Sequence, residues 1–192
     1  MNLPNKLTMT RIFMTSLFAA MFYLTMIPGN FLIAAGIFAL AAFTDFLDGN
    51  IARKRNLVTD FGKFLDSIAD KILVSTALIV LLVPPTGVTI YYWHASLLIA
   101  AIIAREFIIS GFRLVAAKKN VVIAADKSGK IKTFFTDLTI LFTLIAAHFS
   151  PEFGVLNIIA YAALCVSTLL TIVSGAEYLI KNRQLLSSDD NK

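Results

Sequence analysis

The sequence contains little cysteine, histidine or charge. Its single cysteine, Cys165, excludes an intrachain disulfide and is expected to pack within a helix. The two histidines, His94 and His148, are predicted to be interfacial side chains rather than metal ligands, because each lies near the end of an apolar segment. Charged residues make up only 15% of the chain, and no internal repeat or low-complexity segment is visible.

Apolar residues dominate instead. Hydrophobic residues make up 58% of the 192, and the mean hydropathy is +0.79. These values predict an all-α integral membrane protein with six transmembrane helices, forming a single domain over residues 1–183 followed by a polar tail at 184–192. Residues 1–10 are expected to form a cytoplasmic interfacial helix, and no cleavable signal peptide is indicated. The six apolar segments of roughly spanning length are residues 11–27, 31–53, 60–83, 90–117, 131–149 and 153–181.

The connections between these segments alternate in charge. Neutral turn formers occur around Pro28, Pro84 and Pro151, whereas residues 53–55 and 118–132 are rich in Lys and Arg. Because Lys and Arg are retained on the cytoplasmic side, both termini are predicted to be cytoplasmic, in a multi-pass protein of the plasma membrane. The net charge of +5 is attributed to this topology and to anionic lipid headgroups, so no nucleic-acid partner is expected.

Four carboxylates recur at helical spacing across two neighbouring apolar segments. Asp45 and Asp48 fall on one side of the segment at 31–53, and Asp66 and Asp70 form a stripe with Gly62 on the next. If these two helices are antiparallel neighbours, the four carboxylates converge. Like charges so close together need neutralising cations in a poorly hydrated place.

Two divalent cations would satisfy such a cluster. Oxygen ligands favour Mg²⁺ or Mn²⁺, and no His or Cys lies nearby to recruit zinc. The alternative, ordinary acids facing water, is disfavoured because the intervening residues, such as Phe46 and Leu65, are mostly apolar. The expected site lies in the cytoplasmic half of the membrane, where a water-soluble reactant and a lipid can meet.

The stretch from Asp45 to Asp70 reads D-F-L-D-G-N-I-A-R, eight residues, and then G-K-F-L-D-S-I-A-D. It resembles the signature of the CDP-alcohol phosphotransferases, D-x2-D-G-x2-A-R-x8-G-x3-D-x3-D, and every specified position matches. The resemblance implies the fold of that family, a CDP-linked lipid as donor and a homodimer.

The resemblance also implies roles for individual residues. Asp45, Asp48, Asp66 and Asp70 would hold two metals, and Asp70 would be the general base that takes the proton of the acceptor hydroxyl. The residues that the resemblance assigns to the CDP end of the donor are Asn5, Thr8, Arg11, Gly49, Arg53 and Gly62. The alternatives to this donor role are helix packing for Gly49 and Gly62, a cytoplasmic anchor for Arg53, and a headgroup-anchoring helix at the amino terminus.

A cationic cluster further along predicts a site for an acceptor phosphate. Arg105 and Arg113 lie within an apolar segment, and Lys130 and Lys132 follow in the next basic stretch. The alternatives are lysines that only enforce topology, and Glu106 as a packing partner of either arginine. Ser167, Thr171 and Ser174 share a face of the last segment, where interhelical hydrogen bonds are expected and no site is assigned.

The stretches around these cations, and the opening Leu3-Pro4-Asn5, also resemble bacterial phosphatidylglycerophosphate synthases. The implied reaction transfers the phosphatidyl group of CDP-diacylglycerol to sn-glycerol 3-phosphate and releases CMP. Other acceptors remain open, namely phosphatidylglycerol (a cardiolipin synthase of this type), inositol phosphate or serine. A cation transporter or channel is the unlike alternative, but it predicts acids spread along the membrane depth rather than clustered toward one side.

Overall fold

The computed structural model describes residues 3–55, 60–83, 86, 92–119, 121, 127–149 and 154–183. Side chains are described in these ranges except at residues 3–7, 45–55, 60, 61, 63, 92 and 127. All regular structure in this part of the chain is α-helical. The helices are α1 (Leu3–Tyr23), α2 (Asn30–Arg55), α3 (Asp60–Val80), α4 (Tyr92–Lys118), α5 (Lys127–Phe149) and α6 (Gly154–Lys181).

The helix boundaries follow the turn formers in the sequence. The residues expected as an interfacial helix and as the start of the first span form one continuous helix, α1, because no proline or glycine interrupts them after Pro4. This helix ends at Tyr23, before Gly29, which adopts a positive φ of 75°. The Asn30 side-chain amide donates to the Phe22 carbonyl oxygen at 2.9 Å and closes the turn between α1 and α2.

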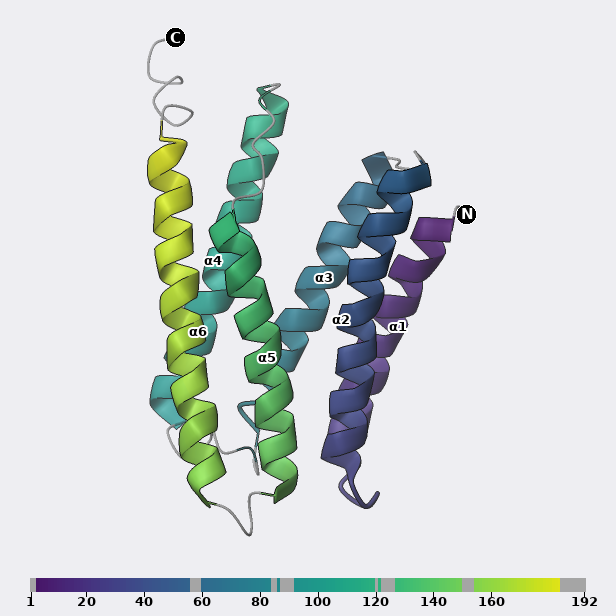
Figure 1. Cartoon of the computed structure of the whole chain (residues 1–192), viewed down its shortest axis with the longest axis vertical. Coiled ribbons are helices and arrows are strands. Elements are labelled where there is room, and N and C mark those ends of the chain that lie inside the picture. Colours follow the sequence, from purple (N-terminus) through teal and green to yellow (C-terminus); the bar gives the residue numbers. More distant parts are fainter. Residues whose placement is uncertain are drawn as a thin grey trace.

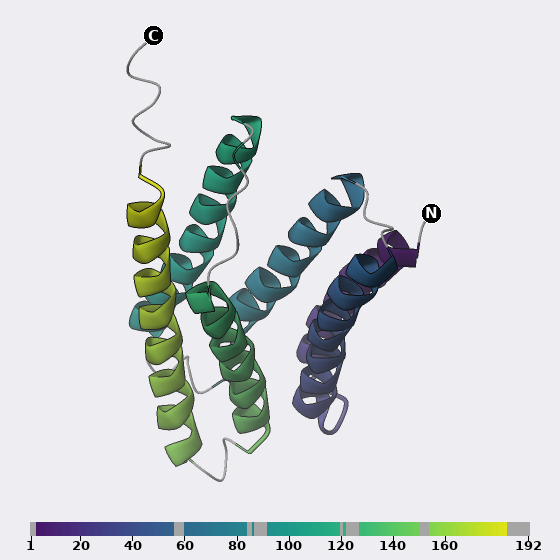
Figure 2. The same ribbon diagram turned by 45° about the horizontal axis from the view of Figure 1, so that its top comes forward.

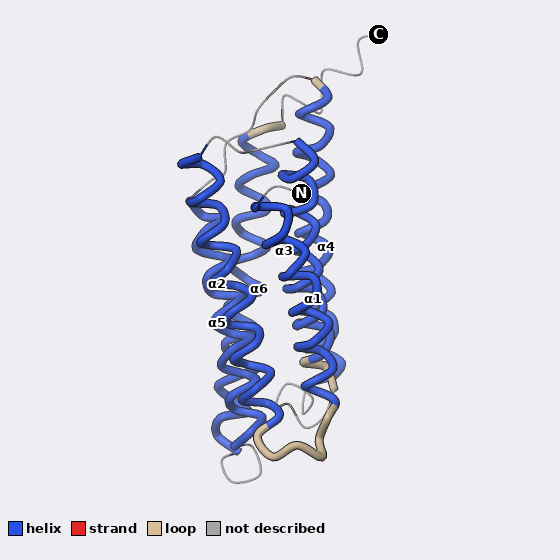
Figure 3. The backbone as a smooth tube through the Cα atoms, turned by 90° about the vertical axis from the view of Figure 1, so that its right-hand side faces the viewer, coloured by secondary structure: helices blue, strands red, loops and turns tan. Residues whose placement is uncertain are grey.

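Successive helices alternate in direction, and their ends gather at the two ends of an elongated bundle (Figures 1 and 3). The start of α1, the end of α2, the start of α3 and the end of α6 share one end, called here the basic end. Helix α1 packs against α2 and α3, and α6 packs against α4 and α5. Helix α3 runs obliquely, from beside α2 at the basic end toward α5 at the other end (Figures 1 and 2).

The hydrophobic core lies mainly toward the end opposite the basic end. It is built from the second halves of α1, α3 and α5 and the first halves of α2, α4 and α6, with the Phe18 and Phe38 rings 5.9 Å apart. The Phe22 and Phe31 rings, 5.2 Å apart, fasten the adjacent turn. Polar and charged side chains are thus left to line the basic end of the bundle.

The exterior of the bundle is apolar, as expected of a surface in contact with lipid. Three helical stretches are long and apolar enough to cross a membrane among the described residues, namely Trp93–Lys118, Ser128–Phe149 and Gly154–Lys181, and Asn30–Thr44 is a shorter apolar stretch. Large exposed hydrophobic side chains on α4 and α6 include Trp93, Leu97, Phe107, Leu114, Val155, Leu169 and Ile180.

Candidate active site between α3, α4 and α5

The α3 carboxylates lie in the half of the bundle near the basic end. Asp66 and Asp70 are four residues apart on α3 and therefore share one face of the helix. Ala69, also on α3, is fully buried, so this part of the helix is packed into the protein rather than surrounded by water. Two carboxylates are thus presented on one helix whose neighbours are α1, α2, α4 and α5.

Arg11 of α1 forms an ion pair with Asp66 of α3. The Arg11 Nη1 donates to Asp66 Oδ1 at 2.8 Å, and the Arg11 side chain is fully buried whereas that of Asp66 is 46% exposed. Thr8, one turn earlier on α1, is also buried. A headgroup anchor would place the guanidinium at the surface, so the burial of Arg11 favours a role inside the protein. The contact joins a residue predicted for the donor to one predicted for the metals.

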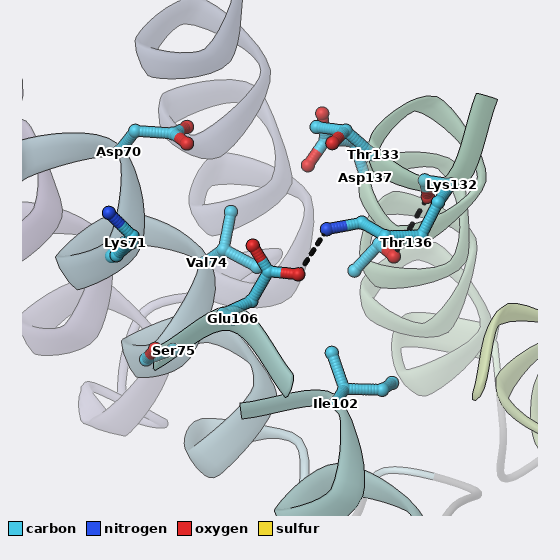
Figure 4. Close-up of a pocket in the computed structure, with 10 residues that line it drawn as sticks. All are labelled: Asp70, Lys71, Val74, Ser75, Ile102, Glu106, Lys132, Thr133, Thr136 and Asp137. Atoms are coloured by element: carbon cyan, nitrogen blue, oxygen red, sulfur yellow. Dashed lines mark hydrogen bonds and ion pairs between the residues drawn. The ribbon is translucent and has the colours of Figure 1, made fainter. Parts of the chain in front are cut away.

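A cavity opens beside Asp70, between α3, α4 and α5. In Figure 4, the Asp70 carboxylate points from one wall toward Thr133 and Asp137 on the other. Lys132 and Glu106 meet below them and bridge α5 to α4 (Figure 4). The complete lining consists of Asp70, Lys71, Val74, Ser75, Ile102, Glu106, Lys132, Thr133, Thr136 and Asp137. A cavity lined in part by carboxylates and lysines therefore lies between α3, α4 and α5.

Glu106 is the centre of a cluster of three charges. Its Oε1 accepts from Lys132 Nζ on α5 and from Arg105 Nη1 at 3.2 Å. Lys132 is only 5% exposed, which is rare for a lysine unless it is paired. The pairing predicted as possible for Glu106 with an arginine is present with Arg105, and Lys132 is a second partner.

Lys71 is a further cation in the lining. Its Nζ donates to Ser67 Oγ at 2.7 Å, one turn back on α3. Asp70, Glu106, Arg113 and Lys132 all lie within electrostatic reach of its ammonium group. Lys71 also borders a second, apolar depression on the outer side of α3 and α4, which is lined by Ile68, Lys71, Ile72, Ser75, Thr76, Ile79 and Phe107. Lys71 therefore stands where the polar cavity meets an apolar surface.

The other predicted acceptor cations occupy different positions. Arg105 is 14% exposed and lies behind Glu106, where its Nη2 donates to Ser174 Oγ on α6 at 2.9 Å. The side chains of Arg113 on α4 and Lys130 on α5 are exposed at the basic end. Of the four cations, Lys132 is the one that lines the cavity.

Part of the predicted metal and donor sites falls outside the described side chains. The side chains of Asn5, Asp45, Asp48 and Arg53 are not described, and Gly49 lies within residues 45–55 of α2, where no side chain is described. Among the described residues, no group of three or more His, Cys, Asp or Glu is placed to hold a metal. Gly62 is described and lies partly buried in the first turn of α3, one turn before Asp66.

Lys71 and Asp137 were not predicted as site residues. Asp137 lies one turn beyond Thr133, so continuing the helical stripe of polar residues on α5 by one turn would have found it. Lys71 directly follows Asp70 and lies about 100° from it around α3, so the stripe of Asp66 and Asp70 does not point to it. Ser174 was expected to make an interhelical hydrogen bond and was assigned no site, and its hydroxyl does accept from Arg105 of α4.

Comparison with known proteins identifies the family of the chain. The family model for CDP-alcohol phosphatidyltransferase matches residues 1–173. A protein of Bacillus subtilis (strain 168), named CDP-diacylglycerol–glycerol-3-phosphate 3-phosphatidyltransferase, is 38% identical, and the match covers 98% of this chain and 99% of that protein. Proteins with the same name from Rickettsia typhi and Pectobacterium atrosepticum are 39% and 37% identical; the matches cover 92% and 93% of this chain, and 94% and 93% of those proteins.

Proposed function

Because the chain belongs to the CDP-alcohol phosphatidyltransferase family, we propose that it transfers the phosphatidyl group of CDP-diacylglycerol to sn-glycerol 3-phosphate. The products are phosphatidylglycerol phosphate and CMP. The observation that carries the proposal is the cavity that Asp70, Lys71 and Lys132 line together. This cavity thus contains a carboxylate that can take a proton and cations that can bind a phosphate.

The acceptor phosphate binds at the cationic part of this cavity. Lys132 contacts the phosphate directly, exchanging part of its pairing with Glu106 for the new anion. Arg113 and Lys130, exposed at the basic end, attract the dianionic acceptor from water. Arg105 adds positive charge from behind Glu106.

Asp70 is the general base of the transfer. It takes the proton from the primary hydroxyl of glycerol 3-phosphate as that oxygen attacks the phosphorus nearer diacylglycerol. The bond from this phosphorus to the oxygen bridging it to the CMP phosphate breaks, and CMP leaves with the electron pair. Because Asp70 lines the cavity that holds Lys132, both ends of the acceptor are fixed by the same site.

The donor is bound by residues of α1, α2 and α3. Asn5, Thr8, Arg11, Gly49, Arg53 and Gly62 are proposed to hold the CDP end. The burial of Arg11 against Asp66 supports this location, since it places a cation beside the proposed metal acids. The apolar depression on α3 and α4 suits an acyl chain of the same lipid, because it adjoins the cavity at Lys71 and Ser75.

Asp45, Asp48, Asp66 and Asp70 are proposed to hold two divalent cations, Mg²⁺ or Mn²⁺. The fit is supported by the shared face of Asp66 and Asp70 on α3 and by donor atoms that are all carboxylate oxygens. Bound there, the cations would neutralise charge on the donor pyrophosphate. Arg11 holds Asp66 Oδ1 in place and leaves the second carboxylate oxygen available.

The protein functions as a multi-pass membrane enzyme. All six helices are proposed to span the plasma membrane, with both termini and the active site at the cytoplasmic side, and two copies to form a homodimer. The basic ends of helices α2, α4 and α6 lie at the same end of the bundle, which supports this orientation.

The proposed function is tested by measuring CMP release from purified protein in detergent with CDP-diacylglycerol and Mg²⁺. Glycerol 3-phosphate, phosphatidylglycerol, inositol phosphate and serine are compared as acceptors. Release with glycerol 3-phosphate alone is expected. Release with another acceptor would retain the transfer chemistry and change the acceptor, and no release with any acceptor would reject the proposal.

A further inference from the structure

Arg105 is held by α6 through two neighbouring residues. The Arg105 Nη2 donates to Ser174 Oγ at 2.9 Å, and Ser174 is 4% exposed. The next residue, Gly175, is also buried. A Cβ atom built on Gly175 would lie 2.9 Å from Arg105 Cγ and 3.1 Å from its Nε. The absence of a side chain at this position is therefore what lets the stem of Arg105 lie across α6.

The Arg105 side chain has little freedom to avoid such a Cβ. Its Cγ is only two bonds from the α4 backbone, so moving it would require a different rotamer or a shift of the helix. Close by, the Phe112 and Tyr178 rings are 6.0 Å apart in an edge-to-face contact that fixes α4 against α6. Any substituent on Gly175 would therefore displace the guanidinium from its two partners.

The displacement would be transmitted to the cavity through one carboxylate. Arg105 Nη1 donates to Glu106 Oε1, and the same oxygen accepts from Lys132 Nζ. Glu106 and Lys132 line the cavity, whereas Ser174 and Gly175 lie on α6, away from its lining. A continuous chain of polar contacts thus runs from α6 through α4 to the lysine of α5.

We propose that Ser174 and Gly175 are positioning residues of the acceptor subsite: they hold Arg105, which orients Glu106 and thereby the Lys132 ammonium toward the acceptor phosphate. This inference rests on the proposed function for the nature of the acceptor. It adds to that function a specificity determinant on α6, a helix that contributes no residue to the cavity lining among the described side chains.

The test compares Gly175→Ala and Ser174→Ala with the wild-type protein in the transfer assay. Each variant is expected to raise KM for glycerol 3-phosphate about three- to tenfold, with kcat and KM for CDP-diacylglycerol changed less than about twofold. Ser174→Thr, which retains a hydroxyl, should restore the KM toward that of the wild type. The matched control is Gly36→Ala on α2, where a Cβ atom meets nothing within 4 Å.

A double-mutant cycle separates positioning from general damage to the fold. Without the Arg105 side chain, a Cβ at residue 175 has nothing to displace, so Gly175→Ala should add little in an Arg105→Ala background. The proposal would be overturned by additive effects of Gly175→Ala and Arg105→Ala on the acceptor KM. Equal rises in the KM values for glycerol 3-phosphate and CDP-diacylglycerol, or an unchanged acceptor KM in both Gly175→Ala and Ser174→Ala, would also overturn it. Should Gly175→Ala fail to fold, Ser174→Ala, which adds no atoms, carries the same test.

The two proposals fail in different ways. Wild-type turnover of glycerol 3-phosphate tests the proposed function, whereas the ratio of variant to wild-type KM tests the role of α6. If the wild type uses another anionic acceptor instead, the same ratio is measured with that acceptor.

Discussion

Lys130 and Lys132 lie two residues apart in the first turns of α5, yet their surroundings differ. The Lys130 side chain is exposed, whereas Lys132 is buried, paired with Glu106 and part of the cavity lining. Helical geometry explains the difference, because residues two apart point about 200° away from each other. The sequence alone predicts the same role, binding of the acceptor phosphate, for both lysines.

Replacing each lysine by alanine separates the two roles. Lys132→Ala should raise KM for glycerol 3-phosphate by roughly tenfold or more, because a hydrogen bond to a charged group contributes about 1.5–3 kcal/mol. Lys130→Ala should raise it by less than about threefold, since an exposed charge contributes about 0–1 kcal/mol. Steady-state kinetics with the acceptor and the donor varied in turn provide the measurement, and equal effects of the two substitutions would contradict the assignment of Lys132.

Residues whose role depends on local spacing could be predicted from the sequence. The stripe of Asp66 and Asp70 follows from the helical period, and α3 presents both on one face as expected. Residues whose role depends on a partner far along the chain could not be predicted. Arg11 meets Asp66 from 55 residues away, and Arg105 meets Ser174 from 69 residues away, and no local pattern encodes either pairing.

At the level of elements, the turn between α1 and α2 depends on a single backbone conformation. Gly29 has a φ of 75°, which residues with a Cβ rarely adopt, and open space surrounds the position. The cost of a substitution there is therefore conformational rather than steric. Helix lengths and turns of this kind were predictable because Pro and Gly mark them in the sequence.

Gly29→Ala should lower the stability of the purified protein by about 1 kcal/mol, the cost of a left-handed conformation for a residue with a Cβ. Gly36→Ala is the matched control, because Gly36 lies within α2 with no neighbour to clash and alanine favours the helix. Thermal unfolding in detergent should show a lower Tm for the first variant only. A similar fall in both would mean that the turn does not depend on the conformation of Gly29.

Which helices become neighbours was less predictable than where they begin and end. Convergence of the four carboxylates requires the helices that carry them, α2 and α3, to be neighbours; the two are in contact, but both pack mainly on α1. Apolar helix faces have little to distinguish one partner from another. The ion pair between the buried Arg11 and the half-exposed Asp66 is a feature that identifies α1 as the partner of α3.

At the scale of the whole molecule, the charged cavity and the hydrophobic core lie toward opposite ends of one bundle. The core is concentrated toward the neutral turns, and the charged cavity opens nearer the basic end. For a membrane enzyme this division places the reaction close to the headgroups, where the soluble acceptor and the lipid donor are both present. The orientation of the bundle then decides from which compartment the acceptor comes.

The proposed orientation can be tested with single cysteines in a Cys165→Ala background. Thr25→Cys lies exposed between α1 and α2 at the neutral end, and Arg183→Cys lies exposed just after α6 at the basic end. A membrane-impermeant maleimide added to intact cells should label the first and not the second. Inverted membrane vesicles should reverse the pattern. Five proposed spans, α2 to α6, separate the two positions, so labelling of both from the same side would contradict this odd number of crossings.

The central claim is that Asp70, in this cavity, is the base for transfer to glycerol 3-phosphate. The most direct measurement follows ¹⁴C from glycerol 3-phosphate into lipid, with CDP-diacylglycerol and Mg²⁺, for the wild type, Asp70→Asn and the control Glu177→Gln, whose carboxylate is exposed on α6. The wild type and the control should incorporate label at the same rate with one CMP released per labelled lipid, and Asp70→Asn should lose activity by about 100-fold or more while keeping its Tm. Undiminished incorporation by Asp70→Asn would contradict the assignment of the base, and absence of labelled lipid from the folded wild type would contradict the acceptor.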